Sequence, residues 1–450
     1  MSLPLLSALS ILDSTAAVKP PSGALSEVSH AAGGPSSFCD TQVQQYSGYF
    51  NLSTGDKHLF YWFFSSRSSP DTDPVVLWLT GGPGCSSEVA LFGENGPCKV
   101  SPDGMTTIPN AASWNTHANL LYVDQPVGTG FSYGTAFDHD EVGVGNDVYA
   151  FLQAFFGAHP ALRSNAFFVF GESYAGHYVP NVAHRVLVGN GAGGAPHINL
   201  VGMSVGNGLT DPEVQYAYYP AMAVSTNQHQ PAVSNATYEK MAKAVPGCIK
   251  AIRRCNGGEG VVSKLACVAA YEMCNAALTA PYQLTGMNPY DMRIKCAKPP
   301  LCYDFSGVGK FLDRPEVRTA LHIRTGTGTW QSCNFKVNKM FMGDWMKNYQ
   351  TQIPALLGAG VRVLIYAGDQ DFICNWLGNQ AWVRDMEWPG KAAFDAAPVK
   401  PWSAEGKQAG EAQAAEGMTF LRVFGAGHMV PLDQPMASLL MLDAFLKGEL

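Results

Sequence analysis

The stretch Phe167-Phe168-Val169-Phe170-Gly171-Glu172-Ser173-Tyr174-Ala175-Gly176 combines an apolar run with one serine among small residues. Four consecutive apolar residues are typical of a buried strand, and residues 174–188 carry apolar side chains at helical spacing. Ser173 is therefore predicted to lie on a sharp strand-to-helix turn, with its hydroxyl exposed and free backbone N–H groups nearby to hold an anion. The generic G-x-S-x-G pattern fails at its fifth position, Ala175. Because Gly-Glu-Ser alone is more often an ordinary loop, a nucleophile here requires a base, an acid and an oxyanion hole elsewhere.

The composition indicates a globular protein. Its 450 residues include 14% charged residues and ample aromatics, which excludes disorder as the main state. The net charge is −7 and no run of Lys or Arg forms a basic patch, so we expect neither nucleic acid nor an anionic membrane surface as a partner. No apolar stretch of about 18 or more residues occurs, so we expect no membrane span. We expect no metal or cofactor.

The N-terminus allows two interpretations. Residues 3–12 form a short apolar run ahead of Thr15-Ala16-Ala17, but no Lys or Arg precedes that run. A weak signal peptide and a disordered leader fit this segment equally well. Residues 18–37 are rich in Ser, Gly, Ala and Pro, so we expect residues 1–37 to be an unstructured or removable leader.

The cysteines favour a secretory route. The chain has 11 cysteines, so at least one thiol is left unpaired. Six of them lie within 55 residues and lack the C-x-x-C pairs of a structural zinc site: Cys248, Cys255, Cys267, Cys274, Cys296 and Cys302. Disulfides are the better interpretation, and they imply a lysosomal, vacuolar or secreted protein. The sequons that begin at Asn51 and Asn235 are then candidate glycosylation sites.

Alternating strand and helix patterns predict an α/β fold. A hairpin is expected around the turn 53–56, and the other predicted elements are strands at 75–79, 120–123, 167–170, 198–205, 361–366 and 419–424 and helices at 142–156 and 435–446. This alternation indicates a mostly parallel central sheet with helices on both faces. The cysteine-rich stretch 213–345 breaks the pattern and predicts a mainly helical cap, inserted into a core of residues 38–212 and 346–450. Residues 389–417 are expected to form a surface loop.

An acid and a histidine follow two late strands. Residues 361–366 run into Ala367-Gly368-Asp369-Gln370-Asp371-Phe372, and the last strand runs into Gly425-Ala426-Gly427-His428-Met429. Catalytic groups collect at this edge of a parallel sheet, and the order Ser, Asp, His is that of α/β-hydrolases. We expect His428 to take the proton of Ser173 and Asp371 to fix the imidazole tautomer. A single histidine is more often structural, so the prediction rests on the joint occurrence.

A glycine-rich run after an early strand supplies candidate oxyanion donors. Leu79-Thr80-Gly81-Gly82-Pro83-Gly84-Cys85 exposes backbone N–H groups where side chains would block approach. We assign the oxyanion hole to the N–H groups of Gly82 and Tyr174. Taken alone, the run would be a plain tight turn.

The chain closely resembles the serine carboxypeptidases over nearly everything after residue 40. The matching motifs are Trp78-Leu79-Thr80-Gly81-Gly82-Pro83-Gly84-Cys85-Ser86-Ser87, Val123-Asp124-Gln125-Pro126-Val127-Gly128-Thr129-Gly130-Phe131-Ser132-Tyr133, Gly171-Glu172-Ser173-Tyr174-Ala175-Gly176, Gly206-Asn207-Gly208 and the loops of Asp371 and His428. This resemblance implies an α/β-hydrolase fold. It also implies removal of one residue from the C-terminus of a peptide through an acyl-enzyme, at acidic pH. The sequence leaves open whether the protein is a monomer or a homodimer.

The resemblance also implies how a free C-terminus is recognised. In the family the residue before the nucleophile, Glu172 here, donates a hydrogen bond to the substrate carboxylate and is supported by a second glutamate that matches Glu94. An ionised Glu172 would repel that carboxylate, whereas a protonated one donates a strong hydrogen bond. Two adjacent acids cannot easily both ionise, so one apparent pKa should be raised. The alternative is that both are surface carboxylates.

Thr80 departs from the family's peptidase pattern. Peptidases of the family have asparagine there, which donates to the substrate carboxylate, and threonine has one hydroxyl donor instead of two amide donors. Gly81 N–H and Glu172 remain as expected partners. Plant acyltransferases of the family also carry threonine, so acyl transfer to an alcohol is the second candidate reaction, although they typically carry Asp at position 172. A protective scaffold without catalysis is a third possibility.

By resemblance, the apolar substrate pockets include Tyr290, Trp345, Cys374 and Met429, which implies a preference for bulky hydrophobic residues. Each of these is otherwise a routine core residue. Cys374 matches the family's free thiol. The resemblance pairs Cys85 with Cys333 and Cys296 with Cys302, allows Cys248 with Cys274 and Cys255 with Cys267, and leaves Cys39 and Cys98 to pair only by elimination.

Overall fold

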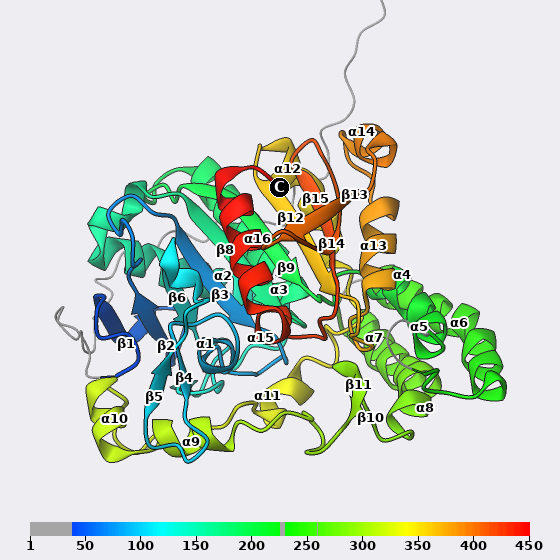
Figure 1. The fold of residues 1–450 in the computed structure, drawn as a ribbon, viewed down its shortest axis with the longest axis horizontal. Helices are drawn as coiled ribbons and strands as arrows, with labels where there is room; N and C mark the ends of the chain where they lie inside the picture. The colour runs from blue at the N-terminus through cyan, green and yellow to red at the C-terminus, as the bar shows by residue number, and fades with distance from the viewer. Residues whose placement is uncertain (1–37, 226–229, 259) are drawn as a thin grey trace, which may run out of the picture.

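The computed structural model describes residues 38–225, 230–258 and 260–450, so the predicted leader, residues 1–37, lies outside the described residues. Its centre is an 11-stranded sheet with the order β1-β2-β6-β3-β8-β9-β12-β15-β14-β13, and β7 pairs with β2 (Figure 1). The strands of this sheet are β1 Gln45–Leu52, β2 Lys57–Phe64, β3 Val75–Thr80, β6 Asn119–Val123, β7 Tyr133–Gly134, β8 Phe167–Glu172, β9 Leu200–Gly206, β12 Arg362–Gly368, β13 Lys400–Ala404, β14 Lys407–Ala415 and β15 Met418–Val423. Two small sheets pair β4 Cys98–Val100 with β5 Thr107–Pro109 and β10 Met287–Asn288 with β11 Asp291–Lys295.

Helices surround this sheet. Those outside the segment between β9 and β12 are α1 Glu88–Gly93, α2 Glu141–Ala158, α3 Ala175–Ala192, α13 Trp376–Asp385, α14 Lys391–Ala396, α15 Val430–Asp433 and α16 Pro435–Lys447. The segment between β9 and β12 contains α4 Pro212–Gln215, α5 Tyr219–Ala223, α6 Asn235–Asn256, α7 Gly260–Cys274, α8 Ala280–Gln283, α9 Ser306–Leu312, α10 Pro315–Ala320, α11 Phe335–Met340, the 3-10 helix η5 Tyr349–Gln352 and α12 Ile353–Gly358.

Six neighbouring strands of the sheet, β6, β3, β8, β9, β12 and β15, run parallel to one another. Both β3 and β8 are buried along their whole length, which explains why their sequences are almost continuously apolar. Helices α2 and α3 contribute to one hydrophobic core, and α1 and α16 contribute to another. The predicted fold, a mostly parallel sheet with helices on both faces, is confirmed. Its topology brings the carboxyl ends of β8, β12 and β15 to one edge.

The prediction of a surface loop over residues 389–417 is wrong. This segment forms α14 and the antiparallel hairpin of β13 and β14, and β14 pairs with β15 in the central sheet. The sequence of β14, Lys407-Gln408-Ala409-Gly410-Glu411-Ala412-Gln413-Ala414-Ala415, is built from residues with low strand propensity. The strand forms because its backbone pairs on both sides.

The segment between β9 and β12 contributes no described strand to the central sheet. Its helices α6 and α7 pack on each other, whereas α9 and α10 lie at the other end of the molecule, near β4 and β5 (Figure 1). There Val308, Phe311 and Val317 join the same core as α1 and α16. The segment therefore reaches well beyond one compact cap, and the boundaries at residues 213 and 345 stay a prediction.

Five disulfides cross-link the described chain: Cys39–Cys98, Cys85–Cys333, Cys248–Cys274, Cys255–Cys267 and Cys296–Cys302. They are the pairs that the resemblance implied, allowed or left by elimination, and Cys374 is a buried free thiol. Two of these disulfides, Cys248–Cys274 and Cys255–Cys267, join α6 to α7. The bond between Cys85 and Cys333 ties the glycine-rich loop after β3 to the loop before α11.

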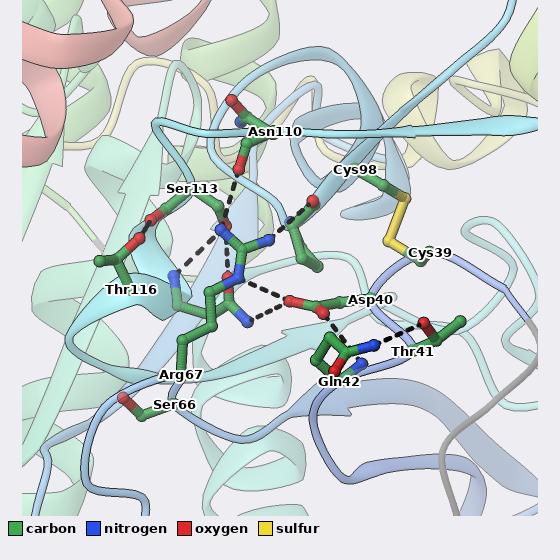
Figure 2. A network of polar contacts seen from close by, with 12 residues as sticks. Cys39, Asp40, Thr41, Gln42, Ser66, Arg67, Cys98, Asn110, Ser113 and Thr116 are labelled. Carbon is green, nitrogen blue, oxygen red and sulfur yellow. Dashed lines mark hydrogen bonds and ion pairs between the residues drawn. A yellow bond between two sulfur atoms is a disulfide. The ribbon is translucent and has the colours of Figure 1, made fainter.

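A polar network fastens the first described residues to the core (Figure 2). Arg67 donates to the Asp40 carboxylate (2.7 Å) and to the carbonyls of Asn110 (2.9 Å) and Pro97 (3.1 Å). Burial opposes ionisation of Asp40, but hydrogen bonds from Arg67 and Asn115 prevail and hold its pKa below the usual value. The network lies beside the disulfide of Cys39, so ionic and covalent contacts hold the same segment.

One stretch among the described residues, Gly260–Gln283, is long and apolar enough to cross a membrane by length and composition alone, with a mean hydropathy of 1.3. The sequence predicted no membrane span here, because no uninterrupted apolar stretch of about 18 residues occurs. Its helix α7 carries Cys267 and Cys274, whose disulfides fix it to α6. Such a helix is weak evidence of a membrane span, because core helices of soluble proteins pass the same test.

Candidate active site

Ser173 occupies the turn between β8 and α3. Its φ is 68°, in the left-handed region that strains a residue with a side chain. The Ser173 amide donates to the Gly206 carbonyl (3.1 Å), and its carbonyl accepts from the Leu209 amide (2.9 Å). These bonds to the chain after β9 fix the turn, and Ser173 borders a cleft of about 630 Å³.

An aspartate and a histidine come together from two other strand ends. Asp371 follows β12 and His428 follows β15, and His428 Nδ1 lies 2.8 Å from Asp371 Oδ2. The buried Asp371 carboxylate also accepts from the amides of Ile373 (3.1 Å) and Cys374 (3.2 Å). With Nδ1 donating to Asp371, Nε2 is left as the basic nitrogen, and His428 borders the same cleft as Ser173.

Asn207 adds a contact to which sequence reasoning assigned no role. Its amide nitrogen donates to Asp371 Oδ2 (2.9 Å), and its amide oxygen accepts from the Gly368 amide (2.9 Å). Asn207 therefore ties β9 to the aspartate loop. The available signal was its place between two glycines directly after a predicted strand.

The glycine-rich loop after β3 lies directly against the serine turn. A Cβ added to Gly81 would lie 2.4 Å from the Tyr174 nitrogen and 2.6 Å from the Glu172 carbonyl oxygen, distances that no side chain tolerates. Gly82 has a φ of 113°, which also favours glycine. Gly81 and Gly82 both border the cleft, and the Tyr174 nitrogen lies against Gly81.

Glu172 and Glu94 form a buried carboxyl pair beside the histidine. Both side chains are about 2% exposed, and Glu172 Oε1 lies 3.9 Å from His428 Nε2. Burial raises the pKa of Glu172 well above its usual value, and the charge of Glu94 raises it further. Burial also raises the pKa of Glu94 to about 7, against the opposing effect of a hydrogen bond with Glu172. Neither is a surface carboxylate.

Thr80 borders the cleft and carries one hydroxyl donor. It is the last residue of β3, and its hydroxyl oxygen accepts from Trp78 Nε1 (3.0 Å). Because that bond uses the oxygen as an acceptor, the hydroxyl proton remains available to another acceptor. Gly81 and Glu172 border the same cleft, whereas Glu94 does not.

Three of the four predicted pocket residues border the cleft: Tyr290, Trp345 and Met429. The ring of Tyr290 also lies 5.1 Å from that of His428, nearly edge-on. Residues of the inserted segment complete the wall, among them the charged Glu272 and Lys339, which sequence reasoning missed. Neither belongs to a recognisable motif, so only the fold reveals them.

Cys374 does not border the cleft. Its sulfur lies within 4.8 Å of ligand atoms of Asp371 and His428. Burial raises the pKa of the Cys374 thiol well above its usual value, so the thiol is a poor nucleophile and a poor metal ligand. We interpret Cys374 as support beneath the histidine loop.

A serine on a strand-to-helix turn, with an aspartate and a histidine after later parallel strands, defines a serine hydrolase of the α/β-hydrolase fold. Residues 35–448 match the family model described as serine carboxypeptidase, and the chain belongs to this family of exopeptidases.

Relatives and a solved structure agree. The chain is 46% identical to a serine carboxypeptidase-like protein of Arabidopsis thaliana over 93% of this chain and 79% of that protein. It is 44% identical to carboxypeptidase Y of Candida albicans over 90% of this chain and 74% of that protein. The crystal structure of a prohormone-processing carboxypeptidase from Saccharomyces cerevisiae superposes with a TM-score of 0.81 at 27% identity, covering 92% of this chain and 94% of that one.

Proposed function

We propose that this protein releases the C-terminal residue of peptides at acidic pH through an acyl-enzyme on Ser173. The observation that carries the proposal is the buried pair of Glu172 and Glu94 beside the serine turn. A carboxyl kept protonated by burial donates a hydrogen bond to a substrate carboxylate, and a general esterase has no use for such a group at that place.

The reaction runs in two halves. Ser173 Oγ attacks the carbonyl carbon of the last peptide bond while His428 Nε2 takes the hydroxyl proton. The tetrahedral intermediate then expels the amine of the C-terminal residue, which takes that proton from His428 and leaves an acyl-serine. Water attacks the acyl-serine and gives its proton to His428, and the shortened peptide leaves with a free carboxyl group as Ser173 regains the proton. Asp371 holds the imidazole tautomer in both halves.

The negative oxygen of each intermediate is held by the backbone N–H groups of Gly82 and Tyr174. The contact between the glycine loop and the Tyr174 nitrogen supports this assignment, because it brings donors from two segments together without side chains between them. Fixed donors in a partly closed cleft cost no reorganisation as charge develops.

The substrate carboxylate is bound by protonated Glu172, which Glu94 supports, and by the Gly81 N–H and the Thr80 hydroxyl. This set selects free C-termini over internal amides. The apolar side chains of Tyr290, Trp345 and Met429 favour bulky hydrophobic residues next to the scissile bond.

Thr80 supports a second candidate reaction, acyl transfer from an ester to an alcohol, because plant acyltransferases of the family also carry threonine at this position. Incubation with a blocked dipeptide, and separately with an acyl glucose ester plus an acceptor alcohol, distinguishes the two reactions. Failure of an organophosphate to label Ser173 would favour a non-enzymatic scaffold instead.

We infer passage through the secretory pathway from the five disulfides, since such bonds persist in oxidising compartments. Residue-by-residue release from a blocked peptide library tests the proposed function. Release must start at the free C-terminus and disappear in the Ser173→Ala variant.

A further inference from the structure

The side chain of Tyr174 points away from the cleft into a buried contact. Its ring stacks on His177 at 4.4 Å and lies 5.3 Å from the ring of Trp345. Its hydroxyl donates to Asp344 Oδ2 at 2.8 Å. The residue directly after Ser173 is thus tied through its side chain to a carboxylate of the inserted segment.

Asp344 makes a second bond of the same kind. Its Oδ1 accepts from the hydroxyl of Tyr349 at 2.8 Å, and the residue is only 3% exposed. Its neighbour Trp345 borders the cleft and donates from its indole nitrogen to the Tyr216 hydroxyl (3.2 Å). One carboxylate therefore joins the serine turn, the cleft wall and the start of η5.

We propose that Asp344 is a positioning residue for the carboxypeptidase reaction, acting through the Tyr174 hydroxyl to hold the serine turn and its oxyanion donor in register with the wall at Trp345. This inference rests on the proposed function. Asp344 itself touches no reacting atom. It fixes the direction of the Tyr174 backbone N–H, and small misplacements of such groups cost rate rather than substrate affinity.

The protonation state of Asp344 depends on burial and on the titratable groups around it. The titratable groups that face it come from three other elements: Asp140 and Glu141 at the start of α2, Tyr174, His177 and Tyr178 at the start of α3, and Tyr349 in η5. Burial raises the pKa of Asp344 to about 6, while the bonds from the two tyrosines oppose that shift. Burial also keeps both tyrosines protonated and therefore donors. Ionised Asp344 accepts both bonds, and protonation removes one acceptor position.

The test compares Asp344→Asn and Tyr174→Phe with the wild-type protein on a blocked peptide acid. Tyr174→Phe removes one oxygen and keeps the ring contacts, so this variant still tests the proposal if Asp344→Asn folds poorly. Each rate is divided by the concentration of sites that an organophosphate labels, which separates turnover from loss of folded protein. At about pH 7, where Asp344 is ionised, we expect kcat to fall about tenfold in both variants while KM changes less than about twofold.

Two further readouts separate positioning from general stabilisation. The double variant should be no slower than Asp344→Asn alone, because both changes remove the same bond. The rate ratio of wild type to Asp344→Asn should shrink as the pH falls through about 6, where wild-type Asp344 becomes neutral too. The control is Asp443→Asn on α16. Asp443 is a largely buried carboxylate whose Oδ2 lies 2.8 Å from His117 Nδ1, outside the site.

The outcomes are distinguishable. Unchanged turnover per labelled site in both variants, or additive losses in the double variant, would overturn the inference while leaving the proposed function intact. If the wild-type protein releases no C-terminal residue beyond the Ser173→Ala background, the proposed function fails and the inference fails with it.

Discussion

Thr80 lies directly opposite Glu172 across the parallel pair of β3 and β8. Both residues end their strands and border the same cleft. The register of two buried strands therefore places two candidate donors for a substrate carboxylate beside each other. The sheet topology, rather than a flexible loop, sets their spacing.

The Thr80→Asn substitution should strengthen binding of free C-termini. An amide supplies two donors where the hydroxyl supplies one, so we expect KM for a peptide acid to fall about three- to tenfold with kcat nearly unchanged. The matching peptide amide is the control, and its KM should not change. A parallel fall for acid and amide would mean that Thr80 acts on the cleft in general.

The Asp371→Asn substitution should keep the fold and remove most of the activity. The amide cannot stabilise the histidine cation and favours the wrong tautomer, so kcat should fall roughly 10⁴-fold with little change in KM. Single-turnover kinetics with a chromogenic ester measure the acylation step directly. A loss below about tenfold would show that His428 works without Asp371.

Glu94 should make stability depend on pH. Its folded pKa of about 7 lies above the usual value of 4.5, so the folded state holds the proton more tightly than the unfolded chain. The stabilisation is complete below about pH 4.5 and is lost as the pH rises through about 7. Glu94→Gln mimics the protonated form. The melting temperature of this variant minus that of the wild type should therefore increase between about pH 5 and about pH 8. A constant difference across that range would contradict the raised pKa.

Glycosylation should favour Asn235 over Asn51. Asn235 is exposed at the start of α6, whereas Asn51 is half-buried in β1 and contacts the ring of His58. In a secretory host, Asn235→Gln should remove one glycan from the mass of the intact protein. Asn51→Gln should leave the mass of the attached glycans unchanged. A glycan on Asn51 alone would overturn this preference.

The sequence predicted the parallel core well because buried strands are apolar throughout, as in β3 and β8. It failed at β14, where Ala, Gly, Gln and Lys form a strand because backbone pairing with two neighbours outweighs side-chain propensity.

The candidate site was likewise predictable from the sequence only in part. Ser173, Asp371 and His428 follow strands of one parallel sheet, so their meeting could be predicted from topology. The contact of Asn207 with Asp371 and that of Tyr174 with Asp344 join residues more than a hundred positions apart. No local pattern encodes such pairs. The place of Cys374 beside Asp371 and His428 likewise depends on how its loop folds.

The pH dependence of kcat/KM for a peptide acid and its matching amide tests the central claim most directly. Between about pH 5 and about pH 9 the substrate carboxylate stays ionised, so the change reports the enzyme. We predict that activity on the acid falls as the pH rises through the titration of the carboxyl pair, which begins at about 7 with Glu94, while activity on the amide falls less. In Glu172→Gln, which stays neutral, the two profiles should become parallel. Superimposable acid and amide profiles in the wild-type protein would contradict the proposal that a protonated Glu172 selects the C-terminus.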